Sequence, residues 1–220
     1  MISLNKNTFS RNALAALIIA FLILFPHFVP LPFYSYAIVC LAVVILYLKS
    51  QHKTLRDLGL KHNGLTGHTF LVGIVSALVW IAFNKWVYYP FITHFFVVEP
   101  YTEYDFIRNK LSNLIITILA GWIIGGFYEE IIFRGFIQTS IQQWFTRNKY
   151  SFWLAGFLTS SLFGLYHWQQ GIFGVVATFL GGLFWTFLLW RYKGNLWYPI
   201  ISHAIYDTIA LTMIYFGIIF

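Results

Sequence analysis

Long apolar stretches alternate with short polar segments along the chain, and this alternation predicts a bundle of membrane-spanning helices. A hydrocarbon core about 30 Å thick needs about 20 apolar residues in each helix that crosses it. Seven stretches reach this length, some only with their flanks, so we expect an all-α fold with seven spans. The spans are Asn12–Val29, Pro32–Leu48, Thr69–Tyr89, Leu111–Gly135, Tyr150–Trp168, Ile172–Trp190 and Leu196–Phe220.

The composition agrees with a polytopic membrane protein. Hydrophobic residues make up 59% of the 220 residues and charged residues 10%, against about 45–50% and 25% in soluble domains. A soluble globule cannot bury so much apolar surface, and the same figures exclude a disordered chain, a coiled coil or a secreted disulfide scaffold. The single cysteine, Cys40, permits neither an intramolecular disulfide nor a CxxC metal site.

The positive charge predicts how the chain is oriented in the membrane. The formal net charge is +7, which in a membrane protein indicates cytoplasmic loops held against anionic lipid rather than a nucleic-acid partner. With a cytoplasmic N-terminus and an external C-terminus, ten of the fourteen basic residues lie inside. Outside are Arg108 and Lys110, in a loop that also carries Glu99, Glu103 and Asp105, and Lys85 lies near the outer end of the third span. The ten inside are Lys6, Arg11, Lys49, Lys53, Arg56, Lys61, Arg147, Lys149, Arg191 and Lys193.

Ionisable residues inside the last four predicted spans are the main functional signal. Such groups cost several kcal/mol in a membrane unless they are paired or hydrated, so they mark functional sites. On a helix the intervals i,i+4 bring side chains together, which predicts contacts of Glu130 with Arg134 and of His203 with Asp207, while Glu129 points away from Glu130. The residues form three patterns: EExxxR (Glu129, Glu130, Arg134), FxxxH (Phe163, His167) and HxxxD (His203, Asp207).

These residue types suit chemistry with an activated water. A carboxylate such as Glu129 can take a proton from water and later pass it to a leaving amine. One His can orient that water, and a second can donate a hydrogen bond to a developing oxyanion. Two His and a carboxylate (His167, His203 and Glu129) could equally hold a divalent metal such as zinc. The Glu130–Arg134 pair on its own could also be purely structural.

The three patterns, in this order on successive spans, resemble the motifs of the CPBP intramembrane proteases, also called the Abi or CAAX-protease-like family. The flanking sequence is similar as well, at Phe133-Arg134-Gly135, Phe163-Gly164-Leu165 and Leu196 to Ile200, and so is Leu58-Gly59-Leu60 in the first cytoplasmic loop. We therefore expect residues 1–110 to form an N-terminal three-span region and residues 111–220 a four-span catalytic core.

The resemblance implies a role for each motif residue. Glu129 would activate water, His167 would assist it, and His203 with Asp207 would stabilise the oxyanion. Glu130, Arg134 and Phe163 would support the site. Asp207 departs from the family, which often has Asn there: it is either protonated in its apolar setting, or it acts as a base or ligand. We favour a mechanism without a metal cofactor.

Three functions are compatible with the sequence. The first is an intramembrane endopeptidase that acts on peptides or membrane proteins, such as a CaaX-like C-terminus or a bacteriocin leader. The second is a transporter or proton relay, although the chain lacks the internal repeats and broken paired spans typical of transporters. The third is a non-catalytic immunity-type scaffold. The compact chain without a recognisable targeting signal favours a multi-pass protein of a bacterial plasma membrane.

Overall fold

The computed structural model describes residues 6–29, 31–97, 102, 104–146 and 148–218 and is helical throughout, without a strand in those ranges. Glu99, Glu103, Arg147 and the last residues of the seventh predicted span lie outside the described residues. The longer helices are α1 (Lys6–Phe28), α2 (Tyr36–Ser50), α3 (Gly67–Phe83), α4 (Tyr89–Phe95), α5 (Leu111–Ala120), α6 (Gln138–Trp144), α7 (Ser151–Tyr166), α8 (Gly171–Arg191) and α9 (Trp197–Tyr215).

The predicted all-α membrane fold is confirmed, and each predicted span coincides with a helix. Judged by length and apolar composition, four helices of the described residues can cross a membrane, or five if a bent pair at α2 counts as one span. The helix α7 is shorter than this test requires. The helix α9 is long enough but does not pass the test of apolar composition, and it carries the polar residues His203 and Asp207. The count of seven spans and the orientation with the N-terminus inside therefore stay predictions, as does the division at residue 110.

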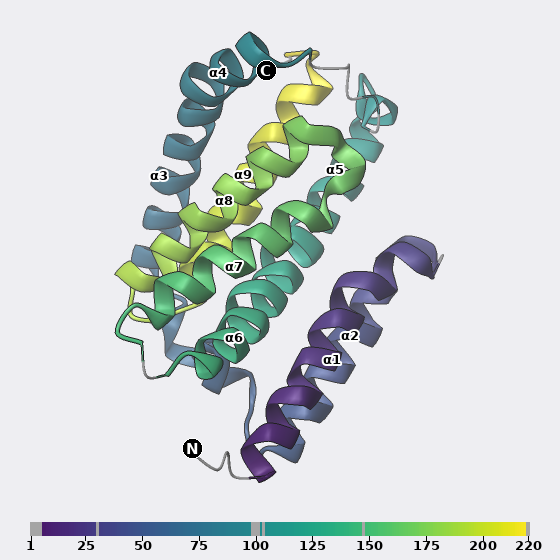
Figure 1. The fold of residues 1–220 in the computed structure, drawn as a ribbon. Helices are drawn as coiled ribbons and strands as arrows, with labels where there is room; N and C mark the ends of the chain where they lie inside the picture. The colour runs from purple at the N-terminus through teal and green to yellow at the C-terminus, as the bar shows by residue number, and fades with distance from the viewer. Residues whose placement is uncertain (1–5, 30, 98–101, 103, 147, 219–220) are drawn as a thin grey trace.

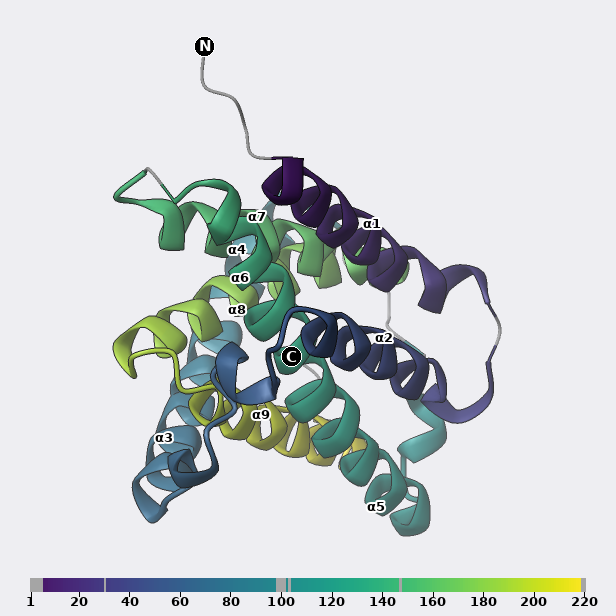
Figure 2. The ribbon, with the colours of Figure 1, turned by 90° about the horizontal axis from the view of Figure 1, so that it is seen from below.

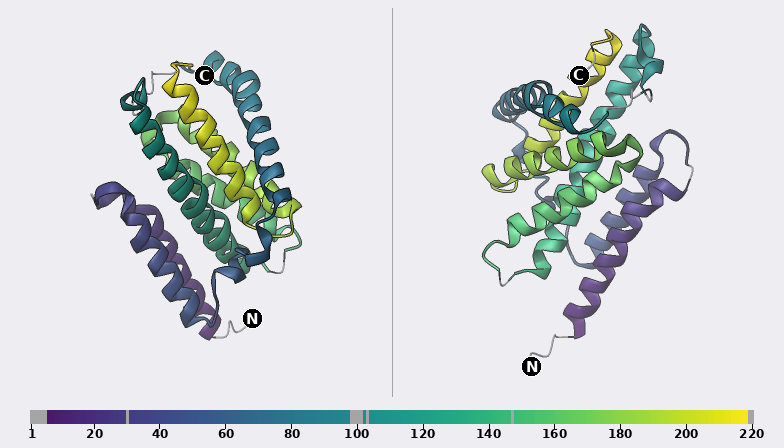
Figure 3. Two further views of the ribbon diagram at one scale, coloured as in Figure 1. Left: turned by 180° about the vertical axis from the view of Figure 1, so that it is seen from behind. Right: turned by 45° about the horizontal axis from the view of Figure 1, so that its top comes forward.

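The helices α1 and α2 form a hairpin at one side of a bundle made by the other helices (Figure 1 and Figure 2). Within the bundle, α7 packs along α8, and α3 packs along α9. The view from behind shows α9 between α3 and the long helix that begins with α5 (Figure 3). The helix α3 thus belongs to the packing of the bundle, although it precedes residue 111.

The fourth predicted span is one long helix with wide turns. After α5 the backbone runs through π-helical turns at η6 (Gly121–Glu129) and η7 (Ile131–Ile137), then continues as α6. Runs of π-helix are rare and occur mostly at functional sites. Here they carry Glu129 and Arg134 of the EExxxR pattern, with Glu130 between the two runs. Nearly every residue of η7 is inaccessible to solvent, so this segment forms the centre of the bundle.

Small residues let α9 approach this helix closely. A Cβ atom added to Gly126 would meet the side chain of Ala204 and the carbonyl oxygen of Ile200. At Gly125 it would meet a carboxylate oxygen of Asp207. The glycines on this face of η6 therefore bring the helix that carries EExxxR against the helix that carries HxxxD.

A loop between α2 and α3 closes one end of the bundle. It begins with a short 3-10 turn, η2 (Leu55–Leu58), in which Thr54 and Asp57 cap each other. Gly59 follows with a φ of 105°, and its carbonyl oxygen accepts a hydrogen bond of 3.1 Å from the backbone N–H of Leu196. These hydrogen bonds fix the start of α9, and with it the height of His203 and Asp207.

Candidate active site

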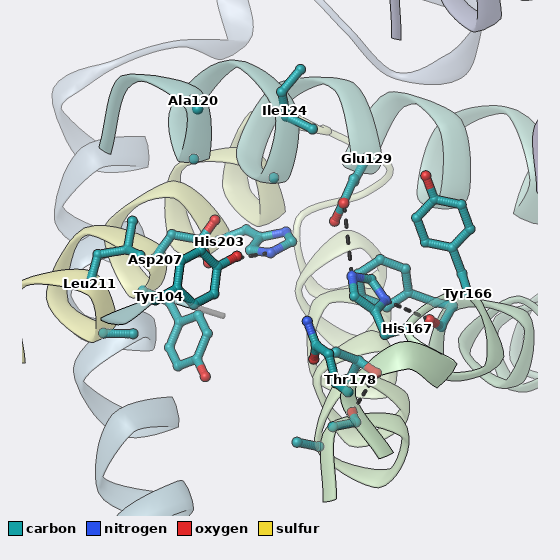
Figure 4. A pocket seen from close by; sticks show the side chains of 18 of the residues that line it. Tyr104, Ala120, Ile124, Glu129, Tyr166, His167, Thr178, His203, Asp207 and Leu211 are labelled. Carbon is teal, nitrogen blue, oxygen red and sulfur yellow. Dashed lines mark hydrogen bonds and ion pairs between the residues drawn. The ribbon is translucent and has the colours of Figure 1, made fainter. Parts of the chain in front are cut away.

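The three sequence patterns meet at one cavity of about 500 Å³. Glu129, Phe163, His167, His203 and Asp207 all line it. Figure 4 shows Glu129 and His167 facing each other across the cavity, with His203 and Asp207 to one side. Glu130 and Arg134 do not line the cavity and lie behind its wall, where both are almost completely buried. The structure thus brings all seven predicted site residues together, with five on the cavity wall.

Glu129 and His167 form the first pair of the site. The distance from Glu129 Oε1 to His167 Nε2 is 3.9 Å, too long for a direct hydrogen bond. His167 lies just after the end of α7, and its Nδ1 is 2.9 Å from the carbonyl oxygen of Phe163. A carbonyl only accepts, so Nδ1 carries the proton of the neutral ring and Nε2 faces Glu129 as an acceptor.

Glu130 forms the second cluster, with Arg134 and His203. Its Oε1 lies 3.3 Å from Arg134 Nη1 and 2.9 Å from His203 Nδ1. The predicted i,i+4 contact of Glu130 with Arg134 is confirmed, and Glu129 points away from it as expected. The hydrogen bond to Glu130 also holds His203 in one ring orientation, so EExxxR positions the imidazole of HxxxD.

Arg134 is held mainly by aromatic rings. Its guanidinium carbon lies 4.2 Å from the centre of the Phe163 ring and 5.2 Å from that of Trp185. Its side chain is 1% exposed, and no hydrogen-bond partner of its nitrogens is found among the described residues. A cation over an aromatic face is stabilised by the ring's electron density. Phe163 therefore supports the site twice, by its carbonyl to His167 and by its ring to Arg134.

His203 is held between Glu130, Asp207 and an indole that sequence analysis did not single out. Its Nε2 lies 3.7 Å from Asp207 Oδ1. The ring of Trp185 stacks on its face, with centres 3.8 Å apart and planes 20° from parallel. The sequence held no signal for this contact, because Trp185 lies five residues before the end of its predicted span, and Trp residues are common near the ends of membrane helices.

The N-terminal hairpin contributes to the cavity wall, which sequence analysis also did not anticipate. His27 of α1 and Tyr36 of α2 line the cavity together with Tyr166 of α7. The His27 ring lies edge-on to that of Tyr166, with the ring centres 4.8 Å apart. Single His and Tyr residues outside the three motifs are common in helices, so their spacing held no signal.

The motif residues include side chains of the kinds that bind divalent metal ions. Among the described residues, no group of three or more His, Cys, Asp or Glu side chains has the geometry to hold a metal ion. The set considered from the sequence was Glu129, His167 and His203. Nε2 of His167 faces Glu129, whereas Nε2 of His203 faces Asp207 and its Nδ1 faces Glu130, so the two imidazoles are not directed at one common point. As placed, these three side chains do not form a ligand set.

Comparisons with known proteins agree with the motif pattern. Residues 111–209 match the family described as Type II CAAX prenyl endopeptidase Rce1-like. The resemblance to the CPBP family is thereby confirmed. The matched region includes all three patterns. The match supports the interpretation of this chain as a membrane-embedded peptidase.

Two bacterial relatives match the chain. It is 29% identical over 178 residues to the "Putative membrane peptidase YdiL" of Bacillus subtilis. The aligned region covers 80% of this chain and 68% of that protein. It is also 29% identical over 114 residues to an "Uncharacterized 24.3 kDa protein" of Escherichia coli, with 51% of each chain covered. No solved structure matches the chain.

Proposed function

We propose that the protein is an intramembrane endopeptidase that hydrolyses peptide bonds with a water activated by Glu129 and His167. The observation that carries this proposal is the 3.9 Å gap between Glu129 Oε1 and His167 Nε2 at the cavity wall. Both atoms are acceptors when the carboxylate is ionised and the imidazole is neutral. A water molecule fits between two such acceptors, because it can donate one hydrogen to each.

In this arrangement the lone pairs of the water point away from both acceptors. One of these lone pairs can attack the carbonyl carbon of a peptide that is bound in the cavity. The water oxygen bonds to the carbonyl carbon, one of its protons passes to Glu129, and the carbonyl electron pair moves onto oxygen. When the carbon–nitrogen bond breaks, the carbonyl re-forms and Glu129 returns its proton to the amine. The products are a carboxyl group and an amine.

His203 is the candidate for oxyanion stabilisation. Its Nδ1 donates to Glu130 (2.9 Å), so a neutral ring would have no proton left on Nε2. A doubly protonated ring would donate from Nε2, and the two carboxylates of Glu130 and Asp207 on either side favour that cation. On this view Asp207 does not face the oxyanion directly. It supports the imidazolium that does.

Glu130, Arg134 and Phe163 are positioning residues in this proposal. Glu130 holds the His203 ring, Arg134 neutralises part of the charge on Glu130, and Phe163 holds His167. The reaction as written needs no metal cofactor. Substrates would be peptides or membrane proteins in a bacterial membrane, and a prenylated CaaX-like C-terminus is the class that the family's name suggests.

The test is peptide hydrolysis by the purified protein in liposomes, with Glu129→Gln compared with the native chain. Gln keeps the size of the side chain but cannot accept the proton. The matched control is Asp105→Asn, an exposed carboxylate of the loop before α5 that pairs with Arg108 and does not line the cavity. We expect hydrolysis by the native protein and the control, incorporation of ¹⁸O from labelled water into the new carboxyl group, and loss of at least about 100-fold in kcat/KM for Glu129→Gln. Full activity of Glu129→Gln would refute the proposal.

A further inference from the structure

The segment that follows His167 turns the chain from α7 into α8 beside the cavity. After α7 the backbone forms one 3-10 turn, η8 (Trp168–Gln170), in which the N–H of Gln170 donates to the carbonyl oxygen of His167 at 2.9 Å. Gly171 follows with a φ of 67°, a positive angle that residues with a side chain rarely adopt. The turn therefore fixes Gln170 three residues after the imidazole that faces Glu129.

Gln170 contributes a carboxamide to the cavity wall. The residue lines the cavity and is half-buried. It is the N-cap residue of α8, but its side chain does not cap the helix. The side chain lies against Gly174, where an added Cβ would meet it. Among the described residues, no hydrogen bond of this carboxamide to another group is found. Its nitrogen and oxygen can therefore bind a ligand.

A carboxamide has the chemistry to bind the backbone of a polypeptide. It presents a donor and an acceptor side by side, and in an extended chain the N–H and C=O of one residue point to the same side. The hydroxyls of two other lining residues, Thr117 and Thr178, already donate to carbonyl oxygens of their own helices at 2.8 and 2.7 Å. Gln169 is the other carboxamide of the wall among the described residues, and it is exposed. Gln170 is thus the better placed of the two.

We infer that the carboxamide of Gln170 binds one residue of an extended substrate, accepting from its N–H and donating to its C=O. This inference rests on the proposed peptidase function, because it takes the cavity as the binding site of a polypeptide. Three residues of a 3-10 turn rise about 6 Å, which an extended chain covers with about two residues. Because His167 faces the scissile bond, the bound residue lies about two positions from it. Gln170 then selects an extended backbone rather than a particular side chain.

The first experiment scans the backbone of the substrate. A farnesylated peptide that ends in Cys-Val-Ile-Ala and a 12-residue apolar peptide are prepared with each amide in turn, except the scissile one, replaced by an ester, which removes the N–H. Hydrolysis in liposomes is measured for the native chain, Gln170→Met and Gln142→Met. Met keeps the length of Gln but has no carboxamide. Gln142 is the matched control, because it is half-buried on α6 and does not line the cavity.

We expect kcat/KM for the all-amide peptide to fall about tenfold in Gln170→Met, mainly through KM, since two hydrogen bonds are lost. The control should keep the native value. In the native protein one ester, about two residues from the cut, should lower kcat/KM several-fold, and the same ester should have no further effect in Gln170→Met. If every ester has the same effect in the native protein and in Gln170→Met, the inference is wrong and the peptidase proposal stands.

A binding measurement tests the contact without hydrolysis. A fluorescent derivative of the 12-residue peptide is titrated into Glu129→Gln in liposomes, and then into the same chain with Gln170→Met or Gln142→Met added. We expect Kd to rise about tenfold with Gln170→Met and to stay unchanged with Gln142→Met. An unchanged Kd with Gln170→Met would overturn the inference. If the native chain cleaves neither peptide while Gln170→Met still weakens binding, the peptidase proposal fails and the contact with Gln170 stands.

Discussion

The imidazole of His203 lies face to face with the indole of Trp185, with the ring centres 3.8 Å apart. The same indole faces the guanidinium of Arg134 at 5.2 Å, and its Nε1 donates to the hydroxyl of Ser202 at 3.3 Å. Trp185 thus touches the proposed oxyanion-binding residue and the buried cation behind it. A residue of α8, outside all three motifs, sets the position of two residues within them.

This contact predicts a selective loss of activity in Trp185→Leu. Leu fills part of the space but provides no aromatic face, and an aromatic contact contributes about 0.5–1.5 kcal/mol beyond area burial. We expect kcat/KM to fall about tenfold for Trp185→Leu and less for Trp185→Phe, measured by peptide hydrolysis. The control is Trp190→Leu, since Trp190 is half exposed on the same helix. Equal losses in Trp185→Leu and Trp190→Leu would mean that the contact with His203 is not functional.

Arg134 is predicted to be needed for folding as well as activity. Removing one partner of a buried ion pair costs about 3–5 kcal/mol, so Arg134→Ala should give little folded protein in detergent. The double variant Glu130→Gln/Arg134→Met leaves no unpaired charge and should restore the yield of folded protein, as seen by size-exclusion chromatography and thermal unfolding. A stable but inactive Arg134→Ala would instead place Arg134 in the chemistry.

The close approach of Gly125 to Asp207 gives a third prediction. A Cβ at this position would meet the Asp207 carboxylate, the end of a side chain, which would have to move aside. Gly125→Ala should therefore push Asp207 away from His203 and lower kcat. Gly67→Ala is the matched control, because no atom lies within 4 Å of a Cβ added there. If the two variants are equally active and stable, the packing of η6 against α9 tolerates a methyl group, and the glycine is not required.

Much of the fold followed from the sequence, because membrane helices must be apolar and about 20 residues long. The contacts within EExxxR and HxxxD followed from the i,i+4 interval, which also suits the wide turns observed. The hairpin's contribution could not be predicted: Tyr36 lies 130 positions before Tyr166, and only tertiary packing brings them together. Trp185 was missed for the same reason, since it reaches His203 from a different helix.

The orientation in the membrane is a prediction that reporter fusions can test. The distribution of basic residues predicts the N-terminus and the α2–α3 loop inside and the C-terminus outside. Reporter fusions at residue 55 and at the C-terminus should therefore report opposite sides of the membrane. This matters because only four or five helices of the described residues pass the length and composition test. If both reporters lie on the same side, one predicted span does not cross.

Substitutions of Asp207 distinguish a mechanism without a metal ion from a mechanism that uses one. Asn has nearly the same shape as Asp, and Glu130 still holds His203 in Asp207→Asn, so activity should fall by less than about tenfold. Removal of a good hydrogen-bond donor to an oxyanion costs about 10²–10³ in rate, and Asp207→Ala, which no longer fixes His203 on that side, should approach that loss.

The same variants are then tested with chelators. If Asp207 supports the His203 imidazolium by its charge, EDTA and phenanthroline leave the native protein and Asp207→Asn unaffected, and metal analysis finds no stoichiometric zinc. If Asp207 is a ligand, Asn is a much poorer one, so metal content and activity should fall together in Asp207→Asn. A tightly bound metal held by His167, His203 and a carboxylate would contradict the mechanism proposed for the water. It would still leave a peptidase, because a metal-bound water can attack the same carbonyl.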